Sequence, residues 1–213
     1  VHFSKGYIKS WLELFDDNDY YSPILPEVID SKVEELHHFN LHNGTIWRWV
    51  RPILGLGVNG LYHLRLELRV VPSGPTLIDT MANMVFHVGL TEGLKLKPQE
   101  LTKMPFEGLE QDFYQVARDG LSANVNWCNG KMGSMQNLLL NHIIPVAYEG
   151  LEKLNIDSPE IWMNIIEQRV KTGQTGAQWI YMHWEKYQDE KLLVKDYMKQ
   201  AKQNIPVHQW PKP

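Results

Sequence analysis

The pattern of apolar and polar residues is typical of β-strands in one stretch of the chain only. Residues 61–71 alternate strictly between polar and apolar side chains, and residues 45–51 are rich in β-branched and aromatic residues. Four residues typical of loops lie in the link between these segments: Gly55, Gly57, Asn59 and Gly60. The pattern therefore predicts an antiparallel strand pair within residues 45–71.

After this stretch the apolar residues recur at helical spacing. Thr76 and Asp79 resemble a capping box at the start of a helix. Ser134 is predicted to cap a long helix, in which Pro145 should introduce a kink. Several further helices are expected up to about residue 204, and the residues from Pro206 onward are expected to form a loose tail.

These segments predict one α+β domain over residues 1–213. Residues 1–44 form a lead-in of helix and loop, residues 45–71 form the strand pair, and residues 76–204 are helical. We expect a small antiparallel sheet packed by a predominantly helical C-terminal half.

Composition and charge exclude several classes of protein. The apolar fraction of 43% and the charged fraction of 22% are those of an ordinary globular protein. A net charge of −4 with interspersed signs argues against a nucleic-acid partner, and no apolar stretch is long enough to predict a membrane partner. The single cysteine, Cys128, favours a reducing compartment, so we expect a cytoplasmic protein.

Alternation along residues 63–70 predicts two unlike faces of one strand. The even positions form an apolar face that must pack on helices: Leu64, Leu66, Leu68 and Val70. The odd positions form a charged face: His63, Arg65, Glu67 and Arg69. This face places a carboxylate between two guanidinium groups.

The charged face has two interpretations. It can be a solvated sheet surface, in which each Arg–Glu pair contributes less than about 1 kcal/mol. It can also be a ligand site, because a carboxylate such as Glu67 can hold Mg²⁺ and arginines clamp phosphate or carboxylate groups. Arg48 and Arg51 add two guanidiniums on the neighbouring strand, which favours an anionic ligand.

Several segments resemble the glutamate–cysteine ligase-like carboxylate–amine ligases. The similarity runs over about residues 11–184, and five segments carry it in order: 41–52, 63–76, 117–123, 144–151 and 165–179. It implies a catalytic domain with a glutamine-synthetase-like fold that uses ATP and Mg²⁺. In such a reaction a carboxylate becomes an acyl phosphate and an amine then displaces the phosphate. The expected substrates are amino acids bound as small molecules, such as the glutamate and cysteine that give the family its name.

The resemblance also implies roles for the strand residues. Glu67 corresponds to a metal ligand, and Arg69, with Arg65, to catalytic groups that face phosphate or substrate. Arg48, Arg51 and His63 are weaker candidates for binding an anionic substrate or phosphate.

The resemblance does not cover a whole catalytic centre. Its remaining metal ligands lie in an N-terminal strand region that has no counterpart here, and residue 1 is Val1 rather than Met. We therefore expect the C-terminal portion of a longer enzyme, inactive alone. The alternatives are a non-catalytic binding or regulatory module that kept the fold, and a helical interaction domain. A homo-oligomer is left open.

A glycine-containing loop at residues 173–179 is the last candidate. Thr175 and Gln178 could contact substrate or phosphate at a helix N-terminus. A helix C-cap followed by an N-cap explains the same residues. The histidines His37, His38 and His42 match no zinc spacing, and Cys128 has no visible activating partner.

Overall fold

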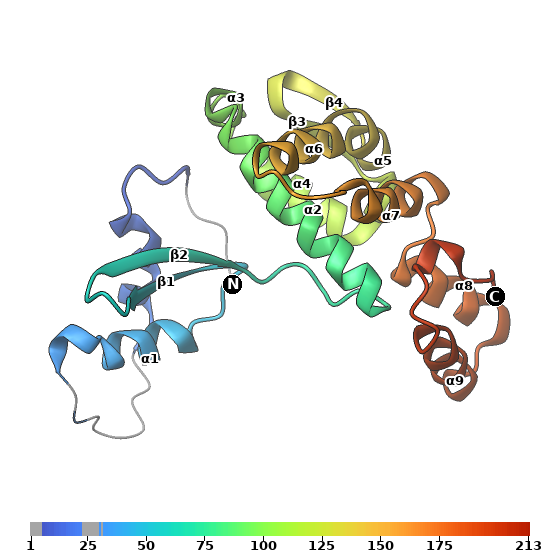
Figure 1. Cartoon of the computed structure of the whole chain (residues 1–213), viewed down its shortest axis with the longest axis horizontal. Helices are drawn as coiled ribbons and strands as arrows, with labels where there is room; N and C mark the ends of the chain where they lie inside the picture. Colours follow the sequence, from blue (N-terminus) through green and yellow to red (C-terminus); the bar gives the residue numbers. More distant parts are fainter. Residues whose placement is uncertain (1–5, 23–29, 31) are drawn as a thin grey trace. The chain divides into compact units, whose positions relative to one another are not determined.

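The computed structural model describes residues 6–22, 30 and 32–213, which form two compact units. The first unit comprises residues 1–72 and the second residues 73–213 (Figure 1). Each contains a small antiparallel strand pair, and helices dominate the second. This confirms a mixed α+β protein with a helical C-terminal half.

The strand pair of the first unit, which we call the hairpin unit, is antiparallel as predicted. Strand β1 (Val50–Leu56) pairs with β2 (Tyr62–Leu68), and Arg51 lies directly opposite Glu67. The connecting turn uses Gly60 with φ of +74°, a backbone conformation that favours glycine. Extended structure begins at Val50, later than the β-rich composition from residue 45 suggests.

Short helices complete the hairpin unit. They are the 3-10 helices η1 (Leu12–Tyr20) and η2 (Val33–Glu35) and the helix α1 (His37–Thr45). Asn43 is buried in α1 and its Nδ2 donates a 2.8 Å hydrogen bond to the carbonyl of Pro52 in β1. This bond ties the helix to the first strand.

The apolar face of β2 is only partly covered. Leu64, Leu68 and Val70 are half-buried, but Leu66 is 53% exposed. The expectation that all four side chains pack on helices is therefore wrong at Leu66. A two-stranded sheet with few helical partners cannot bury a whole face.

The second unit, which we call the helical unit, is built around helices α2 (Leu77–Lys95) and α6 (Ile144–Lys153). The other α-helices are α3 (Pro98–Thr102), α4 (Leu109–Asp119), α5 (Met135–Leu138), α7 (Glu160–Thr172), α8 (Gly176–Tyr187) and α9 (Glu190–Ala201). The central cluster contains Ala82, Ala147, Leu151 and Met163, each at most 1% exposed.

Helices α2 and α6 approach each other through glycines. A Cβ placed on Gly150 would lie 2.0 Å from the carbonyl oxygen of Gly89 and 2.4 Å from the amide of Gly93. A Cβ on Gly93 would in turn lie 2.0 Å from the carbonyl of Val146. Real Cβ atoms cannot approach backbone so closely, so this contact depends on the missing side chains.

Three helix boundaries agree with the sequence signals. The hydroxyls of Thr76 and Ser134 accept hydrogen bonds from amides three residues later, and Gly173 ends α7 in the left-handed conformation. The predicted irregularity at Pro145 takes the form of a π-helical turn, η5 (Leu139–Ile143), just before α6. Proline lacks an amide donor, and a widened turn accommodates this loss.

Two features of the helical unit differ from the predictions. Residues 124–134, which carry no recognisable strand pattern, form the hairpin of β3 (Asn124–Trp127) and β4 (Lys131–Ser134). The predicted loose tail is instead packed, with Val207 fully buried and Trp210 only 3% exposed. Both lie with Trp179 of α8 in one cluster, and burial of two tryptophans holds the segment in place.

Within the described part of the chain, none of the helices has the length and apolar character that crossing a membrane requires.

Candidate functional site

The charged face of β2 holds an ion pair at its centre. Arg51 donates from Nε and from a terminal nitrogen to the same carboxylate oxygen, Oε2 of Glu67, at 2.7 and 2.6 Å. The Arg51 side chain is 23% exposed and that of Glu67 40% exposed. The register that places these two residues opposite each other positions the pair. Both contacts use Oε2, so the other carboxylate oxygen of Glu67, Oε1, can bind a different group.

The other charged residues of this strand have local partners. A terminal nitrogen of Arg65 lies 2.9 Å from Nε2 of His63 on the same face. The guanidinium of Arg69 lies over the ring of Trp47, 5.7 Å from the ring centroid. These contacts orient the side chains without neutralising the two guanidinium charges, so both stay available to an anion.

Arg48 has a different environment from the other predicted arginines. It is only 7% exposed and donates to Oδ1 of Asn43 at 3.1 Å and to Oδ1 of Asn18 at 2.6 Å. These contacts join α1, η1 and the segment before β1. Arg48 is thus a packing residue of the hairpin unit, and its guanidinium is committed to amide oxygens.

Glu67, the expected metal ligand, belongs to no larger group of metal-binding side chains among the described residues. Among the described residues no group of three or more His, Cys, Asp or Glu side chains is placed to hold a metal ion. Mg²⁺ usually keeps several water ligands and takes one or two carboxylates together with nucleotide phosphates. A Mg²⁺ ion at Glu67 would therefore need further ligands, such as water or phosphate oxygens.

A pocket of about 1270 Å³ lies in the helical unit. Its walls come from the end of α4 with the turn after it, the start of α5, and the segment that joins α7 to α8. Two of the segments that carry the family resemblance, 117–123 and 165–179, contribute to this wall. They are more than 40 residues apart, and the fold brings them together.

Thr175 and Gln178, predicted from the glycine-containing loop, both line this pocket. The hydroxyl of Thr175 accepts a 3.1 Å hydrogen bond from the amide of Gln178 and so caps α8. Thr175 thus has the capping role proposed as the simpler explanation, in a position that also faces the pocket.

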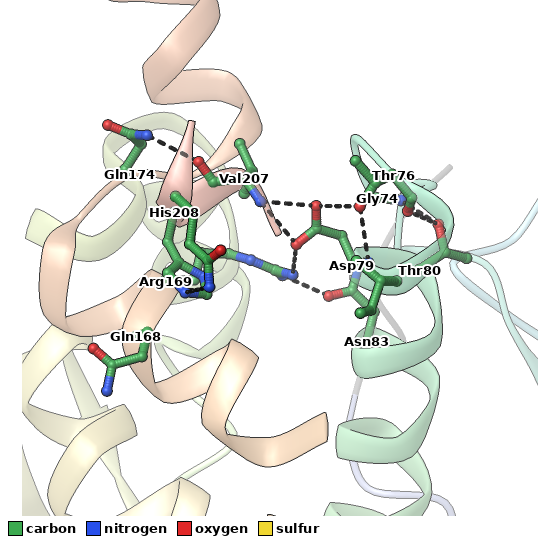
Figure 2. Close-up of polar contacts among 12 residues, drawn as sticks. Gly74, Thr76, Asp79, Thr80, Asn83, Gln168, Arg169, Gln174, Val207 and His208 are labelled. Atoms are coloured by element: carbon green, nitrogen blue, oxygen red, sulfur yellow. Dashed lines mark hydrogen bonds and ion pairs between the residues drawn. The ribbon is translucent and has the colours of Figure 1, made fainter. Parts of the chain in front are cut away.

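A buried ion pair joins α2 and α7 (Figure 2). Asp79 of α2 is fully buried, and its Oδ1 lies 2.7 Å from a terminal nitrogen of Arg169 in α7. Its Oδ2 accepts from the hydroxyl of Thr76 at 2.7 Å and from the amide of Val207 at 3.1 Å. Arg169 also donates to Oδ1 of Asn83 at 2.6 Å. Asp79 thus connects α2, α7 and the C-terminal segment.

His208 lies next to this ion pair. Burial lowers the pKa of its imidazole from the ordinary value, the Asp79 carboxylate raises it, and the Arg169 guanidinium lowers it further. The net effect is a lowered pKa, which favours neutral imidazole in the folded protein.

The C-terminal segment is held in place by side chains of the α7–α8 junction. Gln174 is 5% exposed, and its Nε2 donates to the carbonyls of Val207 at 2.9 Å and Trp210 at 2.7 Å. The indole of Trp179 donates to the carbonyl of Pro211 at 2.9 Å. As a result Lys212 is positioned on the wall of the pocket.

Some residues of this pocket were not identified in the sequence. They are Arg118, Gln136, Gln174 and Lys212, all of which line it. Arg118 lies in a segment of the resemblance, which could have suggested it. Lys212 carries no local signal, because the expected loose tail gave no reason to place it anywhere.

Searches of family models, curated proteins and solved structures found no match to this chain.

Proposed function

We propose that this chain is the C-terminal part of an ATP- and Mg²⁺-dependent carboxylate–amine ligase, of the glutamate–cysteine ligase-like kind, with a glutamine-synthetase-like catalytic domain. The observation that carries the proposal is the charged face of the β1–β2 pair. There Glu67 and Arg65 of β2 lie on the same face as Arg51 of β1, and Arg69 follows directly after β2. The convergence of segments 117–123 and 165–179 on one pocket adds support, since it gives residues far apart in sequence a common location.

In this proposal Glu67 is a ligand of the nucleotide-bound Mg²⁺. Arg51 donates to one oxygen of Glu67 and orients the carboxylate, so that the other oxygen can face the metal. When bound, Mg²⁺ offsets phosphate charge and holds the transferred phosphoryl group in place.

Arg65 and Arg69 supply positive charge for the reacting groups. The γ-phosphoryl group passes from ATP to the substrate carboxylate, which gives ADP and an acyl phosphate. The amine then attacks the acyl carbon, the amide bond forms, and inorganic phosphate and a proton leave. Negative charge develops on phosphate oxygens in the first step, where fixed guanidinium groups stabilise it.

The test is calorimetry of the full-length gene product with Mg-ATP and a panel of amino acids, comparing wild type with Glu67→Gln. Loss of a charged metal ligand should weaken Mg-ATP binding by about tenfold or more. Glu92→Gln is a matched control, because Glu92 also forms one ion pair, with Lys95 at 2.7 Å, but lies outside the resembling segments.

Unchanged Mg-ATP binding in Glu67→Gln would refute the metal assignment. Binding of ligands without turnover of any amine and carboxylate would instead favour the alternative, a non-catalytic module that kept the fold.

A further inference from the structure

The pocket of the helical unit lies at the N-terminal ends of two helices. One wall contains Thr175, Ala177 and Gln178 from the first turn of α8. Another contains Ser134, Met135 and Gln136, where a helical run starts that continues through α5, η5 and α6. The first amides of a helix have no partner within it and lie at its positive end, so this geometry favours an anion.

Hydrogen-bond donors remain at both helix starts. The capping hydroxyls of Thr175 and Ser134 satisfy the amides of Gln178 and Asn137. In the described part of the chain, the amides of Ala177 and Gln136 have no acceptor.

The side-chain charges of the pocket leave one positive charge without a partner. Arg118 is neutralised by Asp119, which accepts from two of its nitrogens at 2.8 Å each. Lys212 forms no ion pair with any residue that the structure describes. The pocket is therefore positive on balance.

Two helices also end at this pocket, and the negative ends of their dipoles would oppose an anion. One carbonyl near the end of each helix is already engaged by a side chain. The carbonyl of Asp119 at the end of α4 accepts from the hydroxyl of Ser122 at 2.7 Å, and that of Val170 in α7 accepts from Nε2 of Gln136 at 2.7 Å. These bonds reduce the repulsion that an anion would meet.

The side chain of Gln174 gives a second indication of a ligand, separate from the helix ends. Its Nε2 donates to two backbone carbonyls, which fixes the amide orientation, because a carbonyl can only accept. Its Oε1 consequently lies on the side turned away from Val207 (Figure 2). No described residue donates to this oxygen, although Gln174 is 5% exposed and lines the pocket.

We propose that this pocket binds a small organic anion. Its carboxylate or phosphate group accepts from the first amides of α8 and from Lys212, and an N–H or O–H group of the ligand donates to Oε1 of Gln174. Its apolar part packs on the apolar lining residues Leu121, Met135, Leu139 and Met182. None of the β2 residues contributes, so binding in this pocket can be tested separately from the metal role of Glu67, although segments of the same pocket also support the proposed ligase function.

The experiment is an NMR titration of the full chain with phenyl phosphate and, separately, phenylacetate. Saturable shifts are expected at the amides of Ala177, Gln178 and Gln136, and the ligand with the lower Kd identifies the preferred anionic group. Lys212→Met should raise that Kd about tenfold, the size expected for loss of one charge-assisted hydrogen bond.

Lys195→Met is the matched control, because Lys195 is an exposed lysine of α9 that does not line the pocket. Its Kd should stay within about twofold of wild type, as surface charge effects are small. Equal weakening in both variants, or shifts that do not saturate, would overturn the proposal. Glu67→Gln should leave this titration unchanged, so failure of the ligase assignment and failure of this site can be told apart.

Discussion

The two units of this protein each contain an arginine–carboxylate pair of nearly the same length in a different environment. In the hairpin unit Arg51 and Glu67 lie 2.6 Å apart with side chains 23% and 40% exposed. In the helical unit Arg169 and Asp79 lie 2.7 Å apart with side chains 14% and 0% exposed. Distance alone therefore does not distinguish the pairs, but burial does.

Burial changes what each pair can do. Water screens the exposed pair, so it contributes little to stability and its groups can exchange one partner for a ligand. The buried pair has lost its hydration, and each charge depends on the other and on neighbouring donors. The first pair is suited to binding and the second to holding segments together.

The largest expected effect comes from breaking the buried pair. Asp79→Asn leaves the guanidinium of Arg169 buried without its counter-charge, which should lower the free energy of unfolding by about 3 kcal/mol or more. Urea unfolding followed by far-UV circular dichroism measures this loss. Glu67→Gln is the matched change in the exposed pair. It should lower the free energy of unfolding by less than about 1 kcal/mol. Similar losses in the two variants would contradict the comparison.

Replacing one buried and one exposed leucine extends the comparison of the two units to apolar packing. Leu138 in the helical unit is 1% exposed and Leu66 in the hairpin unit is 53% exposed. Leu138→Ala should lower the free energy of unfolding by about 2–4 kcal/mol, because it removes buried methyl groups and leaves a cavity.

Leu66→Ala should lower the free energy of unfolding by under about 1 kcal/mol, since much of its side chain already contacts water. Thermal or urea unfolding of both variants tests this. A loss at Leu66 as large as that at Leu138 would mean that another surface covers the apolar face of β2.

The smallest expected effect is on the pH dependence of stability, through His208, which lies next to the buried ion pair. The pKa of His208 is lowered in the folded state, so the unfolded chain binds the proton more readily. The stability contributed by neutral His208 is present above its ordinary pKa and is lost as pH falls through the lowered value. The free energy of unfolding should therefore decline below about pH 6.5 less steeply in His208→Gln than in wild type. Parallel pH profiles would show that His208 does not contribute.

Local signals in the sequence predicted the local features of the fold. Alternation and glycine placement were sufficient for the β1–β2 pair, and the caps at Thr76 and Ser134 follow from side chains that bond amides three residues away. The β3–β4 hairpin was missed, because strands of four residues are too short to show a pattern. Helix α1 contains Asn43 and Gly44, which are poor helix formers, and its contacts with β1 override that preference.

The candidate sites were predictable only in part for a similar reason. Alternation placed His63, Arg65 and Glu67 on one face, but it could not show that Arg51 would lie opposite Glu67, since register depends on the turn. The Asp79–Arg169 pair joins residues 90 apart in sequence. The position of Lys212 depends on two buried tryptophans, and such long-range packing leaves no local pattern.

The glycine contact between α2 and α6 also constrains how this sequence can change. No side chain fits at Gly93 or Gly150, because a Cβ at either position would meet backbone at 2.0 Å. Any protein that keeps this helix crossing should therefore keep glycine at both places, whatever happens to its surface and its charged residues. The spacing of these glycines, with Gly89 one helical turn before Gly93, is thus a search pattern for distant relatives whose overall sequence has diverged.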